Sequence, residues 1–185
     1  MSLHEQVRII TDELTRAMAE IDELQCEALV EQILGARRVL VTGVGRVLIS
    51  LKAWVKRLLQ LGIDINFVGS ETEGPIFAGD LLLVASSSGE SAIPKAIAAI
   101  AKEKGTHVAY IGCTRGSTIE KLAHSRLLLV GRTKFARPGE FASVQPMSTL
   151  FEQQLYLLGD VLALMIMERK GLSEADVKNT HANLE

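Results

Sequence analysis

Five short apolar runs alternate with stretches in which apolar residues recur at helical spacing, and this alternation organises most of the chain. The apolar runs lie at 38–42, 63–68, 81–85, 107–111 and 125–130. The helical patterns between them lie at about 46–61, 91–104 and 117–123. Strands that alternate with helices are typical of stacked βαβ units. The pattern therefore predicts an α/β fold with a doubly wound, five-stranded parallel sheet and helices on both of its faces.

The N-terminal region has its own apolar stripe. Apolar residues from Val7 to Leu29 fall on one side of a helix that we expect to run from about residue 4 to Leu34. Such a helix would be roughly 45 Å long, which is more than a domain of this size needs. The length therefore predicts that part of the stripe packs on another subunit of a homo-oligomer.

The C-terminal third contains a long irregular segment and then more helix. Residues 132–146 include Pro138, Gly139 and Pro146, and a loop of this length is usually functional or mobile. A helix is expected from about Ser148 to Arg169, followed by a short capped helix and a tail. We expect one domain over 1–185, with an N-terminal helix at about 4–34, a sheet core at 38–130 and C-terminal helices and tail at 147–185.

Composition excludes several classes of protein. Apolar residues make up 48% of the chain, charged residues 23%, and the formal net charge is −2, so neither disorder nor nucleic-acid binding is expected. Cys26 and Cys113 form no CxxC pair and the four histidines have no ligand spacing, so we expect no disulfide and no metal. The start lacks a signal peptide, and no uncharged apolar run is long enough to span a membrane. We expect a cytoplasmic protein without a membrane partner.

The strongest chemical signal follows the apolar run 81–85. Ser86, Ser87, Ser88 and Ser91 place four hydroxyls within six residues, immediately before a helical pattern in which Pro94 is tolerated only in the first turn. A helix N-terminus presents unpaired N–H groups and the positive end of the helix dipole, so it stabilises an anion. A single serine acting as an ordinary N-cap is the alternative. The excess of hydroxyls favours a phosphate site.

A second loop follows the first strand and contains Gly43, Val44, Gly45 and Arg46. In a doubly wound sheet, ligands bind at the carboxyl ends of the strands, where the connections diverge to opposite faces. A dinucleotide site is not indicated, because the third glycine of that motif would fall on Leu48 and no acidic residue ends the second strand. Gly43 and Gly45 allow a tight turn and close approach to a ligand. Arg46 either pairs with an anion or only covers the surface.

Four motifs together identify a family resemblance. They are Gly43-Val-Gly-Arg46, Ser86-Ser-Ser-Gly-Glu-Ser91 in place of SGSGET, Pro146-Met-Ser-Thr-Leu-Phe-Glu152 in place of PLGTxFE, and the tail His181-Ala-Asn-Leu-Glu185. With these motifs the chain resembles sugar isomerase (SIS) domains over nearly its whole length. The FE pair and the terminal histidine resemble the 6-phospho-3-hexuloisomerase branch.

The resemblance implies a flavodoxin-like sheet, a homo-tetramer or homodimer, and no metal or organic cofactor. It implies a small-molecule substrate, a 3-hexulose 6-phosphate, that is interconverted with fructose 6-phosphate through an enediol. The serines of the loop and its backbone N–H groups would then hold the phosphate. Glu152 would be the base that moves a proton between C2 and C3, and His181 of a neighbouring subunit would assist proton transfer at the oxygens.

Two of these residues also have ordinary explanations. Thr149 to Glu152 has the spacing of a capping box, in which Glu152 would only bind the start of its own helix. A histidine such as His181 in a terminal tail is usually solvated.

The chain also departs from the family pattern in ways that leave the substrate open. Val47 stands where serine is common, and Glu71 and Glu73 replace a small Thr-Pro segment. An isomerase of a different sugar phosphate, or a sensor that binds a phosphosugar without turnover, therefore remain as alternatives. An interaction protein that uses the fold only for assembly is disfavoured by the hydroxyls gathered at the expected ligand position.

Overall fold

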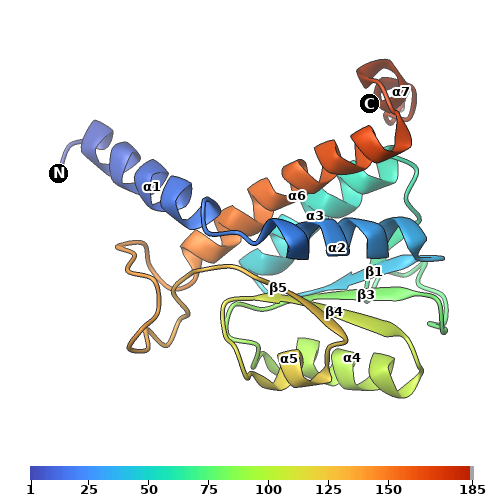
Figure 1. Ribbon diagram of the computed structural model, residues 1–185, viewed down its shortest axis with the longest axis horizontal. Coiled ribbons are helices and arrows are strands. Elements are labelled where there is room, and N and C mark those ends of the chain that lie inside the picture. The colour runs from blue at the N-terminus through green and yellow to red at the C-terminus, as the bar shows by residue number, and fades with distance from the viewer. Residues whose placement is uncertain (184–185) are drawn as a thin grey trace.

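The computed structural model describes residues 1–183 and confirms the predicted sheet (Figure 1). Five parallel strands lie in the order β2-β1-β3-β4-β5. They are β1 (Val39–Thr42), β2 (Ile65–Phe67), β3 (Leu81–Ala85), β4 (His107–Gly112) and β5 (Ser125–Leu128). This order is flavodoxin-like, and the chain reverses its direction of travel between β1 and β3.

Helices cover both faces of the sheet. In Figure 1, α2 (Glu23–Gly35), α3 (Arg46–Gln60) and α6 (Thr149–Lys170) lie above it, whereas α4 (Ala92–Glu103) and α5 (Thr118–Leu122) lie below. Two hydrophobic clusters result, one around Trp54 and Phe151 and the other around Leu40 and Tyr110. The central strand β3 is buried along its whole length, which explains its unbroken apolar sequence.

The expectation of one long N-terminal helix is wrong. The chain forms α1 (Leu3–Met18) and α2, separated by a turn at 19–22. Asp22 causes the break, because its side chain accepts a hydrogen bond from the amide of Gln25 and caps a new helix. As a result α2 packs on the sheet, while α1 projects away from it (Figure 1). Only Glu13 and Ala17 of α1 are buried.

Helix α6 is the core of the helical layer. By length and composition alone it could cross a membrane, with 22 residues and a mean hydropathy of 1.3 in its most apolar window, but 56% of that window is buried inside the fold. Gly159 lets α3 approach closely, since a Cβ there would overlap the ring of Trp54. The indole N–H of Trp54 donates to the carbonyl of Leu155 at 2.6 Å. Packing within the fold therefore accounts for the buried side of α6.

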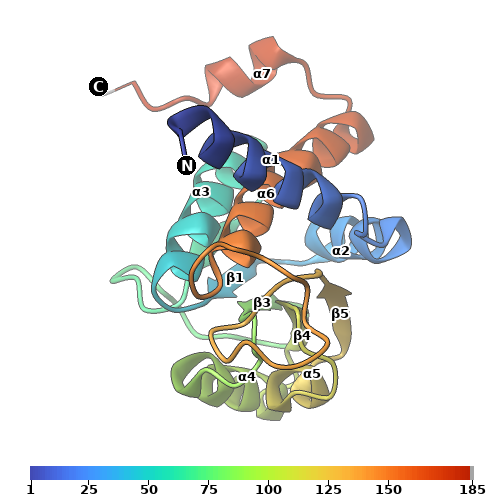
Figure 2. The same cartoon turned by 90° about the vertical axis from the view of Figure 1, so that its left-hand side faces the viewer.

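The segment between β5 and α6 is irregular, as predicted, and lies at the carboxyl edge of the sheet. Figure 2 looks onto this edge and shows the segment between α1 and the α4–α5 layer. Ala136 and Met147 have positive φ angles of 46° and 57°. These angles are unusual for residues with a side chain, so the surrounding contacts must hold the segment in this form. After α6 the chain ends in the short helix α7 (Glu174–Asn179) and a tail.

Candidate active site

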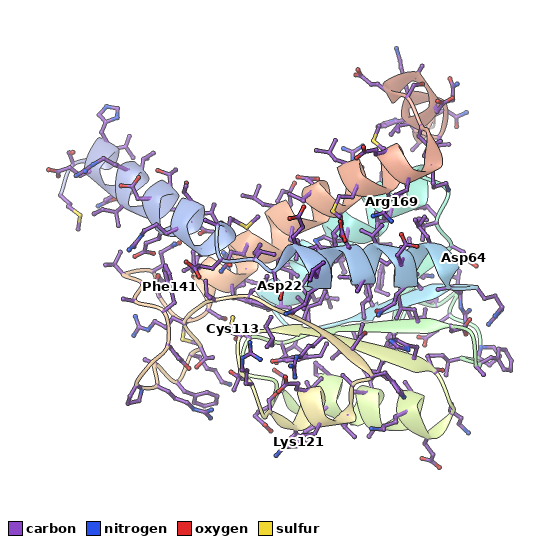
Figure 3. The ribbon with its side chains drawn as sticks, in the orientation of Figure 1. Asp22, Asp64, Cys113, Lys121, Phe141 and Arg169 are labelled. Carbon is purple, nitrogen blue, oxygen red and sulfur yellow. The ribbon has the colours of Figure 1, made fainter. Side chains whose placement is uncertain are left out.

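The glycine loop after β1 and the serine loop after β3 end side by side. The two strands are neighbours, and Thr42 pairs with Val84 in their register. A Cβ on Gly43 would lie 3.4 Å from the carbonyl oxygen of Ala85. Figure 3 shows Cys113, which follows β4, at this carboxyl edge and Asp64, which precedes β2, at the opposite edge. The sheet therefore brings together the two loops that the sequence singled out.

The carbonyl groups of the serine loop accept hydrogen bonds from β4 and from the turn that follows it. The carbonyl of Ser86 accepts from the buried Tyr110 hydroxyl at 3.0 Å. The carbonyl of Ser87 accepts from the amide of Cys113 at 3.0 Å and from the hydroxyl of Thr114 at 3.1 Å. Positions 86 and 87 are thus anchored to β4 and the turn that follows it.

A second set of contacts anchors the end of the loop to α5. The carboxylate of Glu90 accepts hydrogen bonds from the amide and hydroxyl of Thr118, and these bonds hold the pKa of Glu90 below its usual value. Gly89 has a φ of 63°, and a Cβ there would overlap the Ser117 side chain. Only glycine fits this close approach.

The carbonyls of Ser86 and Ser87 already accept hydrogen bonds from the protein, whereas three N–H groups of the loop remain as donors. Among residues 1–183, the amides of Ser87, Ser88 and Ser91 have no protein acceptor. The hydroxyl of Ser91 lies 3.1 Å from that of Ser86 and makes no capping bond to its own helix α4. The ordinary N-cap alternative therefore does not describe Ser91. The loop gathers N–H and O–H groups at a helix N-terminus, an arrangement that is suited to an anion.

The glycine loop begins α3 in a similar way. Gly45 precedes the helix with a φ of 59° and offers no capping side chain. Val47, where the resemblance predicts serine, is buried and packs in the core beside Gly43. The Val47 side chain therefore contributes to the packing beneath the loop.

Arg46 pairs with Glu152, a contact that the sequence did not indicate. The guanidinium Nε donates to Oε2 of Glu152, and the Ser148 hydroxyl donates to Oε1 at 3.0 Å. Glu152 is only 8% exposed, whereas the Arg46 side chain is 66% exposed. The Ser50 hydroxyl binds the main-chain carbonyl of Glu152 at 2.9 Å and fixes the first turn of α6 against α3.

The capping box that the sequence allowed at the start of α6 does not form. The helix begins after Ser148 without a side-chain cap, and the hydroxyl of Thr149 donates to the carbonyl of Pro146 at 2.7 Å. Glu152 does not bind the amide of Thr149. Its carboxylate is instead directed towards Arg46 and Ser148, at the edge of the sheet.

A cleft of about 640 Å³ opens beside this carboxylate. Its walls come from α1, from the segment before α6, and from Arg46 and Glu152; they comprise Met1, Gln6, Ile9, Ile10, Arg46, Val144, Gln145, Pro146, Met147, Thr149, Glu152 and Gln153. The serine loop is not part of this lining. The contribution of α1 was missed by sequence reasoning, because the break at 19–22 decides where α1 points.

His181 is not brought to the other candidate residues within one chain. The hydroxyl of the preceding Thr180 donates to the carbonyl of Gln60 at 2.6 Å, so the tail lies at the end of α3 opposite to Arg46. A helix of 15 residues separates these ends by about 22 Å. Figure 1 shows α7 and the C-terminus at the far end of α6 from the irregular segment. That a neighbouring subunit supplies His181 stays a prediction, and residues 184–185 of the tail motif lie outside the described residues.

The other expectations concern acids and metal ligands. Glu71 and Glu73 lie in the exposed turn after β2, where the carboxylate of Glu73 binds the amide of Gly69 at 2.5 Å. The Glu73 carboxylate is therefore bound within its own turn.

In the described part of the chain, no group of three or more His, Cys, Asp or Glu side chains is placed to hold a metal ion.

Comparison with known proteins identifies relatives of this chain. No protein-family model matches the chain. A 3-hexulose-6-phosphate isomerase of Bacillus subtilis is 34% identical over 187 residues, covering 100% of both chains. A protein of the same name from Mycobacterium gastri is 30% identical over 96% of this chain and 88% of its own. A solved structure from Methanococcus jannaschii, described as inferring a function of 3-hexulose-6-phosphate isomerase, superposes with a TM-score of 0.82 at 27% identity and covers 98% and 99% of the two chains.

Proposed function

Because the chain belongs to the family of 3-hexulose-6-phosphate isomerases, we propose that it interconverts a 3-hexulose 6-phosphate and fructose 6-phosphate in the cytoplasm. One observation carries this proposal. A loop with three amides that are unpaired within residues 1–183 lies at the same sheet edge as a buried carboxylate, and Arg46, which follows the adjacent glycine loop, pairs with that carboxylate of Glu152.

The serine loop is the proposed phosphate site. The amides of Ser87, Ser88 and Ser91 and the hydroxyls of the loop would surround the phosphate oxygens, and the dipole of α4 adds to the attraction. Gly43 and Gly45 let the neighbouring backbone approach the sugar. The phosphate lies away from the reacting carbons, so its binding energy orients the sugar for the chemical step.

Glu152 is the proposed base. In the direction towards fructose 6-phosphate, it takes the proton from C2 and the electron pair forms the C2–C3 double bond of an enediolate. Glu152 then returns the proton to C3 while the hydroxyl proton on O2 is lost and one is gained on O3. The Arg46 guanidinium lies beside the carboxylate, so it can stabilise negative charge on these oxygens. His181 of a neighbouring copy is the proposed carrier of the oxygen-bound protons.

An oligomer is part of the proposal, because the chain does not place its own His181 at the site. Large apolar side chains are exposed on two helices, and such patches mark interfaces. They are Leu3, Val7 and Ile10 on α1 and Tyr156, Leu157, Val161 and Leu164 on α6. We propose that these faces form a homo-tetramer or homodimer. Light scattering that shows a monomer at micromolar concentration would contradict it.

The test is a solvent-deuterium exchange screen over a panel of sugar phosphates. The wild type should incorporate deuterium at C3 of fructose 6-phosphate and at C2 of its 3-ketose isomer. Glu152→Gln should slow this exchange by about 10²- to 10⁴-fold and leave sugar-phosphate binding within a few fold. Glu168→Gln, an exposed acid on the same helix, is the matched control. A wild-type chain that binds the sugar phosphates but never exchanges these protons would overturn the proposal in favour of a sensor.

A further inference from the structure

Glu13 connects the projecting helix α1 to the segment that leads into α6. It is 4% exposed, and its carboxylate accepts three hydrogen bonds from a segment about 130 positions further along the chain. The donors are the Ser143 hydroxyl at 2.7 Å, the Val144 amide at 2.7 Å and the Gln145 side-chain amide at 3.1 Å. In Figure 3 the neighbouring Phe141 lies directly below α1. The first helix is thus bound to the irregular segment through one buried acid.

Residues 143–148, which we term the strap, run directly from these contacts to Glu152. The backbone N–H of Gln145 donates to the Ser143 hydroxyl at 3.1 Å, and Gln145 is itself buried. Met147 then adopts its positive φ of 57°, a conformation that costs free energy and persists only when neighbouring contacts enforce it. The next residue, Ser148, donates its hydroxyl to Oε1 of Glu152. Whatever holds 143–145 therefore also determines where the Ser148 hydroxyl points.

The hydrogen bonds to Glu13 keep its carboxylate ionised. Burial alone would raise the pKa of Glu13, but the hydrogen bonds from Ser143, Val144 and Gln145 outweigh burial and hold its pKa below the usual value. The carboxylate is therefore ionised at neutral pH. Hydrogen bonds to an ionised acceptor are stronger and more directional than neutral ones, so three of them restrict the strap tightly.

We infer that Glu13 is a positioning residue for Glu152: it holds the strap so that Ser148 orients the carboxylate that abstracts the proton. This inference rests on the proposed function, in which Glu152 is the base. It assigns to α1, which otherwise projects from the fold, a part in the chemical step. The alternative is that Glu13 only attaches α1 to the body of the protein.

Kinetics of Glu13→Ala and Glu13→Gln separate these roles. A displacement of about 1 Å at a reacting group can cost about 100-fold in rate, so Glu13→Ala should lower kcat by about 10- to 100-fold. KM should change by less than about threefold, because the serine loop is anchored elsewhere. Glu13→Gln keeps one acceptor for the strap and should retain an intermediate kcat. Asp12→Ala, which removes the exposed neighbouring acid on α1, should behave as the wild type.

Hydrogen exchange provides a readout that does not depend on activity. In Glu13→Ala, exchange should accelerate in 143–153 and stay unchanged in the serine loop. If Glu13→Ala fails to fold, Glu13→Gln and Ser143→Ala, which removes one donor, provide the same comparison. Faster exchange confined to α1, or an unchanged kcat in a variant with a loosened strap, would overturn the inference. A wild-type chain without isomerase activity would contradict the proposed function separately, since the protection of the strap is measured without substrate.

Discussion

The serine loop and the Glu152 carboxylate lie at the same edge of the sheet but are held in different ways. The loop is anchored by residues of β4, of the turn after β4 and of α5 that lie 24 to 28 positions away in sequence. Glu152 depends on Arg46 and Ser50, more than 100 positions away, and on a strap fixed by α1. The proposed phosphate half of the site is therefore a product of the sheet, whereas the proposed proton-transfer half depends on how three helices pack.

This difference predicts that the two halves can be damaged separately. A change in the serine loop should weaken binding of the sugar phosphate and leave the bound complex reactive. A change near Glu152 should slow the chemical step and leave binding intact. Variants that alter both sugar-phosphate binding and the rate of the chemical step would show that the two halves act as one unit.

Among substitutions of serines at the site, the largest effect is expected in the phosphate half. Replacing Ser88 and Ser91 together by alanine removes two hydroxyl contacts to a charged group, each worth about 1.5 to 3 kcal/mol. Binding of fructose 6-phosphate should weaken by more than about tenfold, measured by calorimetry, with kcat at saturation within about threefold.

Ser173→Ala is the control for this double variant, because Ser173 caps the distant α7. Unchanged affinity in the double variant would remove the serine loop from the site.

A smaller effect is expected in the proton-transfer half. Ser148→Ala removes the hydroxyl that orients Oε1 of Glu152 but leaves the Arg46 pair in place. We expect kcat to fall by about three- to tenfold with KM unchanged, measured by steady-state kinetics. Thr149→Ala is the matched control, since the Thr149 hydroxyl donates to the carbonyl of Pro146 and not to Glu152. A rise in KM without a fall in kcat would place Ser148 in the phosphate half.

The smallest effect concerns the opposite edge of the sheet and serves to separate stability from the site. There His124 Nδ1 accepts the Val108 amide at 3.0 Å, and His107 lies 3.0 Å from the Ser125 hydroxyl. Burial, and then the nearby charge of His124, lower the pKa of His107. The unfolded chain therefore binds more protons below the usual pKa of about 6.5, so the free energy of unfolding should fall as pH decreases through that region.

Urea unfolding at about pH 7.5 and about pH 5.5 measures this loss above the range in which carboxylates titrate. His107→Gln should reduce the difference between the two pH values. If stability instead rises on acidification, the lowered pKa of His107 is wrong.

Much of the fold could be predicted from sequence because its signals are local. The run from Leu81 to Ala85 is apolar throughout since both of its faces are covered, and β2 alternates since it lies at an edge. The serine loop could be identified from its hydroxyls at a strand-to-helix junction. Asp22 was the available signal for the break between α1 and α2, but an apolar stripe that continued past it concealed the turn.

The proton-transfer half could be predicted only in part. Glu152 was identified through the resemblance, while its partners Arg46 and Ser148 and the role of Glu13 were not. The only signal for Glu13 was an acid lying on the buried side of α1, next to Ala17 on the following turn. Nothing local indicated that three donors from 143–145 would surround it.

By itself the amino-acid sequence determined the alternation of strands and helices, the parallel sheet, and the position of the anion loop at its carboxyl edge, because each depends on periodicity and on the residues of a single turn. Only the tertiary structure decided that Arg46 meets Glu152 and that Glu13 holds the strap. These contacts join segments more than 100 positions apart. Their formation depends on the packing of whole helices, a property that no short stretch of sequence encodes.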